Sequence, residues 1–336
     1  MRLRIWSFLL PAAFLLGAAV VPPSLQAQET HVLIVAGLGG EPRFQEQFVE
    51  WGSRMAEGAH LAGVPEERVT FLAEDTQGSP GTVDGRSTRE EVEAAFRRIA
   101  EVSSPNDRVL ILLIGHGSGS GPDSLVNLPG PSLRAAEYEA LIEGLAPRQV
   151  AVVNVASASG DFVPVLVGDG RIVITATRSS AQRNATVFGG HFISAFLEES
   201  ADADRDGRIS LLEAFEYARI ETERHFRERN LLPSETALLE DRPDGSGVTE
   251  PGGEGEVGLL ASRFFLEGPR RTDDPDIDPR LVELLAEEER LEQEVRELLQ
   301  QVDALDEDEY RSRLEALLTE LARVGQEIRQ VEGDPE

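Results

Sequence analysis

Five apolar runs constrain the fold of this chain more than any other feature of its sequence. They cover residues 31–38, 68–73, 108–114, 149–155 and 171–177 and are rich in valine and isoleucine. Hydrophobicity that continues without alternation is typical of strands buried on both faces of a parallel sheet. Amphipathic segments such as "STREEVEAAFRRIAEV" and "SLRAAEYEALIEGL" lie between the runs. Strand and helix repeated in this order predict a three-layer α/β fold, in which helices cover both faces of the sheet.

The first 27 residues predict an export signal peptide. Two arginines precede an apolar stretch from Ile5 to Val21, and a polar break then leads to a small-residue cleavage site at Ala27. The apolar stretch is shorter than the roughly 20 residues of a membrane span and contains Pro11, which favours cleavage over a retained anchor. We therefore expect a periplasmic or extracellular protein with no stable membrane insertion after cleavage.

The composition of the chain changes sharply near residue 269. We assign residues 28–268 to the α/β domain, with a last strand at 259–266, and the proline-broken residues 269–279 to a linker. Leucines then recur every seven residues from Leu284 to Leu305, and a second heptad pattern runs from Tyr310 to Val331. These patterns predict an antiparallel helical hairpin with coiled-coil-like packing over residues 280–332. The hairpin is either a docking arm, through which the chain forms a homo-oligomer, or an element that packs on its own domain.

The charge and the cysteine content exclude several classes of function. The chain has 61 acidic and 32 basic residues, a net charge of −29, and no cysteine. Such acidity opposes binding to nucleic acid and to anionic membranes, whereas it suits divalent cations. Without cysteine no disulfide can form, so the stability of an exported protein must come from its core. A cysteine nucleophile is excluded as well.

The stretch "DADRDGRISLLE", residues 202–213, matches the positions of an EF-hand calcium loop. Gly207 stands where the loop turns sharply, and the flanking segments have helical patterns. Calcium requires six or seven oxygens. We expect them from the side chains of Asp202, Asp204, Asp206, Ser210 and Glu213 and from the carbonyl of Arg208. The alternative is a solvated acidic turn that caps the following helix. The match favours a structural calcium site of modest affinity.

A histidine and a serine follow two of the predicted strands. "RVLILLI" leads into "GHGSGSG", which contains His116, and "QVAVVNV" leads into "ASASG", which contains Ser157. Ligands of parallel α/β sheets bind beyond the carboxyl ends of the strands, where both residues lie. Each residue also has a structural interpretation, as a polar group that caps a turn or bonds a loop. The other histidines are expected to be packing or surface residues: His31, His60, His191 and His225.

The segments "LLIGHGS" and "VVNVASASG" resemble the caspase-like clan of cysteine peptidases, and its legumain-type bacterial members in particular. In that clan a glycine follows the general-base histidine at one strand end, and the nucleophile ends the next strand in a small-Cys-x-Ser-Gly pattern. The resemblance, which covers roughly residues 32–266 in element order, implies that His116 is the base and that the Gly117 amide is an oxyanion donor. Ser157 stands at the cysteine position, and Ser159 with Gly160 matches the trailing Ser-Gly. The first strand–helix turn, "VAGLGGEPRF", lacks the glycine patterns of nucleotide-binding loops.

Serine at the nucleophile position changes the activity that the resemblance implies. A thiol with a pKa of about 8.5 ionises partly near neutral pH, whereas a serine hydroxyl needs a well-oriented base. Asp123 and Asp161 are candidates for an orienting acid by proximity in sequence alone. We therefore expect a pseudopeptidase that binds peptide or protein partners. The alternatives are an active endopeptidase-like hydrolase with a Ser157–His116 dyad, and a calcium-stabilised scaffold whose hairpin is the interaction arm.

Overall fold

The computed structural model describes residues 28–76, 83–205, 207–243, 245–252, 257–266, 278–299 and 305–332. The predicted signal peptide, residues 269–277 of the predicted linker, and Asp206 of the predicted calcium loop lie outside the described residues. Within the described part of the chain, no helix is both long and apolar enough to cross a membrane.

Seven strands of the described residues form the main sheet, in the order β3-β2-β1-β4-β7-β8-β9. Five of them correspond to the predicted apolar runs: β1 (Thr30–Ala36), β2 (Val69–Ala73), β4 (Arg108–Ile114), β7 (Gln149–Asn154) and β8 (Arg171–Thr175). These five strands run parallel to one another. The carboxyl ends of β4 and β7 therefore lie side by side at one edge of the sheet.

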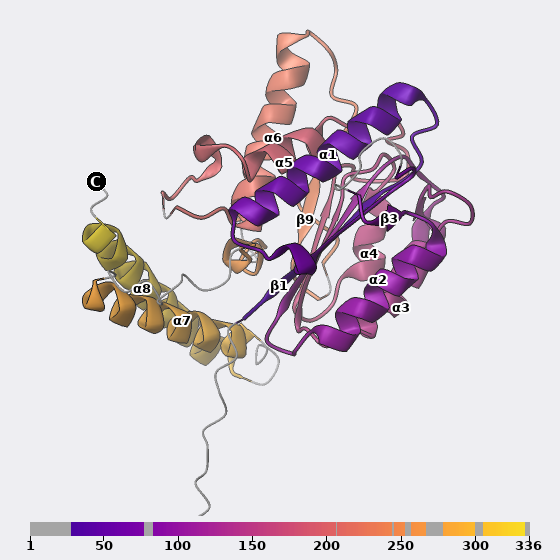
Figure 1. Ribbon diagram of the computed structural model, residues 1–336. Helices are drawn as coiled ribbons and strands as arrows, with labels where there is room; N and C mark the ends of the chain where they lie inside the picture. Colours follow the sequence, from indigo (N-terminus) through magenta and orange to yellow (C-terminus); the bar gives the residue numbers. More distant parts are fainter. Residues whose placement is uncertain are drawn as a thin grey trace, which may run out of the picture.

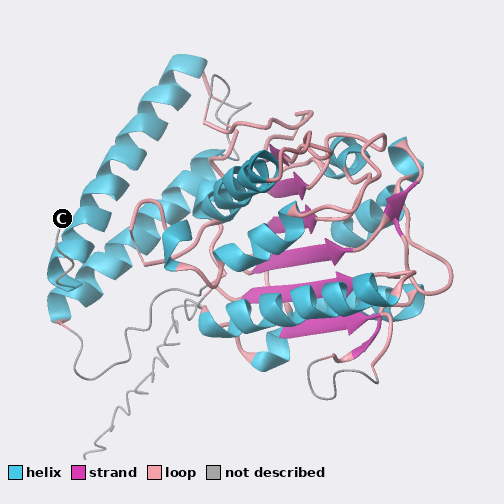
Figure 2. Cartoon of the chain, turned by 90° about the horizontal axis from the view of Figure 1, so that it is seen from above, coloured by secondary structure: helices cyan, strands magenta, loops and turns pink. Residues whose placement is uncertain are grey.

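Helices cover both faces of the sheet, as predicted (Figures 1 and 2). One face carries α1 (Pro42–Leu61), α5 (Phe188–Ala195) and α6 (Leu211–Glu228), and the other carries α2 (Arg89–Val102), α3 (Ala135–Glu143) and α4 (Val163–Leu166). Successive residues of β1 alternate between two hydrophobic cores, since Val32 and Ile34 lie in the first and Leu33 and Val35 in the second. All four are 0% exposed, which explains why the run is continuously apolar.

Short strands complete the sheet in places that the sequence did not indicate. β3 (Gly85–Arg86) pairs with β2, and β9 (Leu238–Glu240) pairs antiparallel with β8. A separate hairpin of β5 (Gly117–Ser118) and β6 (Leu125–Val126) follows His116.

The prediction of a last strand at 259–266 is wrong. This segment contains a 3-10 turn at Ala261–Arg263, and among the described residues its β pairing is limited to one isolated bridge between Phe265 and Ser210. Its apolar side chains, such as Phe264, are buried in the core shared with α6 rather than by strand pairing. Burial without pairing produces the same apolar pattern in the sequence as a buried strand.

The predicted hairpin consists of α7 (Pro279–Leu299) and α8 (Glu307–Glu332), which lie side by side (Figure 1). Its heptad positions face each other: Leu291 of α7 and Val324 of α8 are 2% and 0% exposed and belong to one cluster. A second cluster joins Val295 and Leu314 to Leu259 of the α/β domain. The apolar stripe is therefore used within the chain, and at Leu259 the hairpin packs on its own domain.

Candidate functional site

The two predicted residues follow neighbouring strands, at the carboxyl end of each. His116 follows β4 and Ser157 follows β7, and the two strands are paired up to Leu113↔Asn154. The amide of Gly117 donates a hydrogen bond to Oγ of Ser157 across 3.2 Å. The residue after the predicted base therefore contacts the predicted nucleophile position directly.

Ser157 lies in a tight, buried turn. It is 2% exposed, and the next residue, Ala158, has a φ of +54°, in the left-handed region that is unfavourable for a residue with a Cβ. The amide of Ala158 donates to the carbonyl of Gln182 at 2.8 Å, which holds the turn in place. A Cβ on Gly117 would lie 2.1 Å from the carbonyl oxygen of Ser157. Only glycine fits at position 117, which gives a steric reason for the His-Gly pair.

The trailing Ser159 and Gly160 fix this turn to the loop after β8. The hydroxyl of Thr177 accepts hydrogen bonds from the amides of Ser159 (2.7 Å) and Gly160 (3.1 Å), while Oγ of Ser159 accepts one from the amide of Thr177 (3.2 Å). A Cβ on Gly160 would lie 2.1 Å from the carbonyl carbon of Arg178. In this structure the Ser-Gly pair joins the turn after β7 to the loop after β8, and it thereby fixes the backbone next to Ser157.

The imidazole of His116 is half-buried against aromatic rings. Its centroid lies 4.6 Å from that of Phe44 and 5.2 Å from that of Phe48, both in edge-on contacts. Burial lowers the pKa of His116, against the opposing effects of a hydrogen bond to the backbone of Gly39 and of the charge of Glu41. The ring is therefore neutral at neutral pH, which is the state that accepts a proton.

The candidate orienting acids lie elsewhere. The carboxylate of Asp123 pairs with Arg134 at 3.3 Å. The carboxylate of Asp161 accepts hydrogen bonds from the amides of Gly121 (2.9 Å) and Ser180 (3.2 Å). Among the described residues, no carboxylate is hydrogen-bonded to His116, whose hydrogen bond goes to the backbone of Gly39 instead.

Gly39 is itself held by a neighbouring strand. Its amide donates to Oε2 of Glu74, just beyond β2, at 2.9 Å, and a Cβ at this position would lie 2.5 Å from the amide nitrogen of Gln45. The glycine therefore lets the chain pass close to the start of α1. The sequence contains "GLGG" at this point, but nothing in it indicates that a backbone group would contact His116.

The remaining histidines have structural positions. His31 is 2% exposed and lies 3.6 Å from Asp107 at the opposite end of the sheet. His191 and His225 lie edge to face between α5 and α6, with centroids 6.4 Å apart. His60 contacts the carbonyl of Val64 at 3.1 Å. None of these four contacts His116 or Ser157.

A buried carboxylate supports the same edge. Glu235 is 5% exposed and accepts hydrogen bonds from the amides of Val187 (2.8 Å) and Phe188 (3.3 Å) at the start of α5. Burial raises its pKa to about 7, although both hydrogen bonds act in the opposite direction. The next residue, Thr236, accepts a hydrogen bond from the side chain of Gln182, whose carbonyl holds Ala158. Nothing in the sequence "LLPSETALLE" indicates this role of Glu235.

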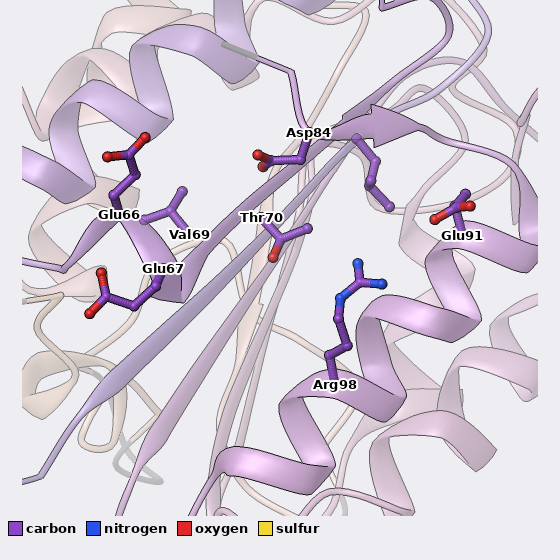
Figure 3. A pocket seen from close by; sticks show the side chains of 8 residues that line it. Glu66, Glu67, Val69, Thr70, Asp84, Glu91 and Arg98 are labelled. Carbon is purple, nitrogen blue, oxygen red and sulfur yellow. The ribbon is translucent and has the colours of Figure 1, made fainter. Parts of the chain in front are cut away.

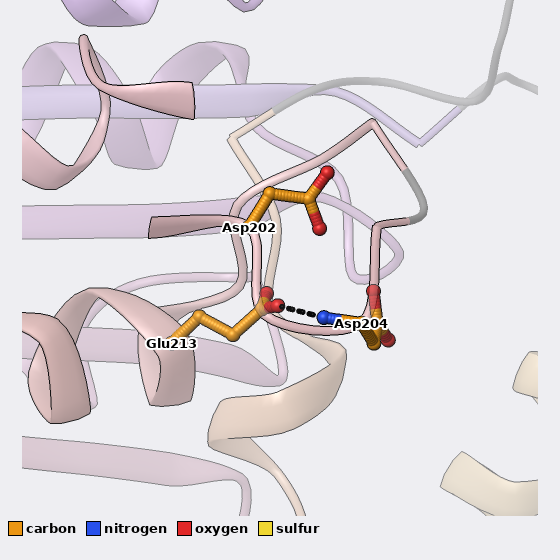
Figure 4. A group of neighbouring side chains, drawn as sticks. All are labelled: Asp202, Asp204 and Glu213. Carbon is orange, nitrogen blue, oxygen red and sulfur yellow. Dashed lines mark hydrogen bonds between the residues drawn. The ribbon is translucent and has the colours of Figure 1, made fainter. Parts of the chain in front are cut away.

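The predicted calcium loop brings three carboxylates together (Figure 4). One oxygen from each of Asp202, Asp204 and Glu213 lies within 4.8 Å of the others. Gly207 has a φ of +79°, and its amide donates to Oδ2 of Asp202 at 2.8 Å, which closes the turn as the motif requires. This donor set suits a hard divalent cation, because calcium is bound by carboxylate and carbonyl oxygens.

The other predicted ligands lie around this cluster. Ser210 caps α6, since its Oγ accepts from the amide of Glu213 at 3.2 Å and donates to the carboxylate of Glu213 at 2.8 Å. The guanidinium of Arg208 stacks on Phe265 at 3.6 Å from the ring centroid, and this residue was predicted to contribute only its carbonyl. The amide of Leu211 donates to Phe264, so residues 264–265 pair with the end of the loop.

An open acidic groove lies on the outer side of β2 (Figure 3). It has a volume of about 590 Å³. Its charged lining residues are Glu66, Glu67, Asp84, Glu91 and Arg98. The amide of Asp84 donates to the carbonyl of Phe71 at 2.8 Å, and the carboxylate of Asp84 accepts from the amide of Phe71 at 2.7 Å. These bonds occupy the backbone groups of Phe71, so no further strand can pair with β2 at this residue.

Comparison with known proteins gives no family for this chain. No family model matches it, and no curated protein matches it. Among solved structures, the crystal structure of a protein from Geobacter sulfurreducens is similar, with 16% sequence identity and a TM-score of 0.40. The match covers 63% of this chain and 91% of that one. A likeness at this level supports no statement about activity.

Proposed function

We propose that the α/β domain is an exported homologue of the caspase-like peptidases in which Ser157 replaces the nucleophilic cysteine, and that it binds peptides or protein partners without cleaving them. The observation that carries this proposal is the contact between Oγ of Ser157 and the amide of Gly117, at 3.2 Å. An oxyanion donor must point at the substrate's carbonyl oxygen. Here the donor implied by the resemblance is occupied by the side chain of the nucleophile position itself.

Two further features support binding without catalysis. Ser157 is 2% exposed, so an incoming carbonyl has little access to its hydroxyl. No carboxylate among the described residues is hydrogen-bonded to His116, whereas a serine nucleophile depends on an oriented base more than a thiol does.

The alternative is a hydrolase that uses a Ser157–His116 dyad. The neutral imidazole and its bond to the Gly39 backbone favour this reading, because a backbone carbonyl can fix the ring of a base in one tautomer. The Ser157 side chain would then have to rotate, so that its hydroxyl leaves the Gly117 amide and bonds the imidazole of His116 instead.

Covalent labelling by a fluorophosphonate separates the two functions. A pseudopeptidase stays unlabelled and releases no product from a peptide library, yet retains bound peptides. Labelling of the wild type that is lost in both Ser157→Ala and His116→Ala would contradict the proposal and establish the hydrolase.

We also propose that residues 202–213 bind calcium as a structural ion. The support is the convergence of Asp202, Asp204 and Glu213 and the left-handed Gly207. Because residues 264–265 pair with this loop and Leu259 packs on the hairpin, an ion here would stabilise the junction between the domain and the hairpin. The protein would then be a calcium-stabilised scaffold. If a truncated chain that ends at residue 268 forms oligomers with the same number of subunits as the full chain, the hairpin has no role in self-association.

A further inference from the structure

Two histidines face each other between two helices that cover the sheet. His191 lies on α5 and His225 on α6, and their rings meet edge to face with centroids 6.4 Å apart. Both side chains are half-buried. Glu221 lies one turn before His225, so its carboxylate is on the same side of α6. The packing of α5 on α6 therefore brings two imidazoles together beside one carboxylate.

Both imidazoles are in the protonation state that binds a metal ion. Burial lowers the pKa of His191, and the charge of Glu221 acts in the opposite direction. Burial also lowers the pKa of His225, and the charge of Arg229 adds to this effect. The two rings are therefore neutral at neutral pH, and a neutral imidazole has a lone pair that a metal ion can accept.

The spacing of the two rings is close to that of two ligands of one ion. Because metal–nitrogen bonds are about 2 Å long, two imidazoles on one tetrahedral ion have centroids about 5 Å apart. The rings of His191 and His225 have to approach by roughly 1 Å, which rotation of partly exposed side chains allows. Among the described residues, only the calcium loop brings three acidic or histidine ligand atoms within 4.8 Å of one another. A third ligand of the histidine pair therefore has to come from a rotated Glu221 or from water.

Two neighbouring groups affect how the pair binds a ligand. The hydroxyl of Thr222, one turn before His225 on the same face of α6, is buried and has no hydrogen-bond partner among the described residues. A water or a carboxylate bound to an ion at the pair gives such a hydroxyl a partner. Nη1 of Arg229 lies 3.2 Å from Nδ1 of His225. A guanidinium can only donate, so Arg229 occupies the lone pair of this nitrogen and competes with a metal ion for the ring.

We infer that His191 and His225 bind a transition-metal cation of the zinc class, with Glu221 or water as the further ligands. Imidazole nitrogen suits zinc, copper and nickel, whereas calcium takes oxygen ligands, so this site differs chemically from the calcium loop. The ion joins α5 to α6. The inference is independent of the proposed function, because it requires neither peptide binding at Ser157 nor calcium binding.

Titration of the full chain with zinc in a calorimeter tests the inference. Calcium is kept in excess, so that it occupies the carboxylates of the calcium loop. The variants are His191→Gln, His225→Gln and Arg229→Gln, and the control His60→Gln removes an imidazole from an exposed position on α1. Unfolding temperatures measured without zinc establish that each variant is folded.

The wild type and His60→Gln should bind zinc at this site with the same affinity. His191→Gln and His225→Gln should each weaken binding by at least about tenfold, because loss of a direct ligand costs no less than loss of a group that orients one. Arg229→Gln should bind zinc more tightly, since it removes a competing donor and a positive charge. The inference is overturned if no zinc binds in excess calcium, if binding survives either substitution of the pair, or if Arg229→Gln does not strengthen it. The two rings then only pack α5 against α6.

Discussion

The substitution Glu235→Gln should change how the stability of the protein depends on pH. Burial raises the pKa of Glu235 from 4.5 to about 7. The folded protein therefore keeps this proton up to about pH 7, whereas the unfolded chain releases it near its ordinary pKa. Between these values the unfolded state binds fewer protons, so the free energy of unfolding falls as pH rises. Glutamine does not titrate and removes this contribution.

The magnitude follows from the size of the shift. A shift of about 2.5 units, at about 1.4 kcal/mol per unit, corresponds to about 3.5 kcal/mol in full, of which about 3 kcal/mol falls between pH 4.5 and 7.5. Urea unfolding of both proteins at steps from pH 4.5 to 7.5 measures it. The free energy of unfolding of Glu235→Gln, minus that of the wild type, should rise by about this amount with pH. A constant offset from altered bonding to Val187 and Phe188 cancels in the slope.

Glu137 provides a control of opposite character. Its hydrogen bonds to Arg89 and to the amide of Arg134 lower its pKa to about 2, so its stabilising effect is complete above the ordinary value of 4.5 and is lost only as pH falls below it. Glu137→Gln should therefore destabilise the protein by the same amount throughout the window. A flat difference for Glu235→Gln, or one that falls with pH, would refute the assignment of Glu235 as a buried acid that titrates near neutrality.

Three further predictions concern the calcium loop and the Ser157 turn. Calcium at a hundredfold its Kd should stabilise the protein by about 2.7 kcal/mol, and Glu213→Gln should largely abolish this effect. If neither calcium nor a chelator changes the unfolding temperature, the loop is only a helix cap. Ser157→Cys introduces the single thiol of a chain without cysteine. Its alkylation rate should fall when His116 is also replaced by alanine, because a nearby base promotes thiolate formation. Equal rates would mean that His116 does not act on the side chain at position 157. Gly117→Ala should destabilise the protein by about 1–3 kcal/mol through contact with the Ser157 backbone, whereas Gly168→Ala, which meets only the Arg171 side chain, should have a smaller effect in the same urea titration.

Hydrophobic patterns predicted the centre of the fold but not its margin. Strands such as β1 and β4 are buried on both faces, so their sequences contain few polar residues. The segment 259–266 has a similar composition for a different reason, because Phe264 and its neighbours are buried against α6 and the loop before it. Composition reports burial but not hydrogen-bond pairing, and β9, which has three residues, is too short for a pattern.

The site was predictable only where the residue type determines the chemistry. His116 and Ser157 are recognisable because they follow apolar runs, and the strand order then explains their proximity. Two of the contacts that determine their state come from groups with no sequence signature, the backbone of Gly39 and the carbonyl of Gln182. The resemblance singled out the amide of Gly117, but not its bond to Oγ of Ser157. Every residue has such backbone groups, so only the tertiary structure shows which of them reach the site.

The pairing of β1 with β4 also determines how the chain must fold. Glu29 and Asp107, which are hydrogen-bonded where this pair begins, are 78 residues apart, and an α/β segment containing β2 lies between them. The centre of the sheet therefore cannot form from local contacts, and closing a loop of this size precedes the gain from pairing. Until that closure, both strands expose apolar side chains that other chains can bind. Refolding from denaturant should be slow, and it should yield less soluble protein as the protein concentration rises. The yield of this protein should therefore depend on a low concentration during refolding and on chaperones during synthesis more than on the stability of the folded state.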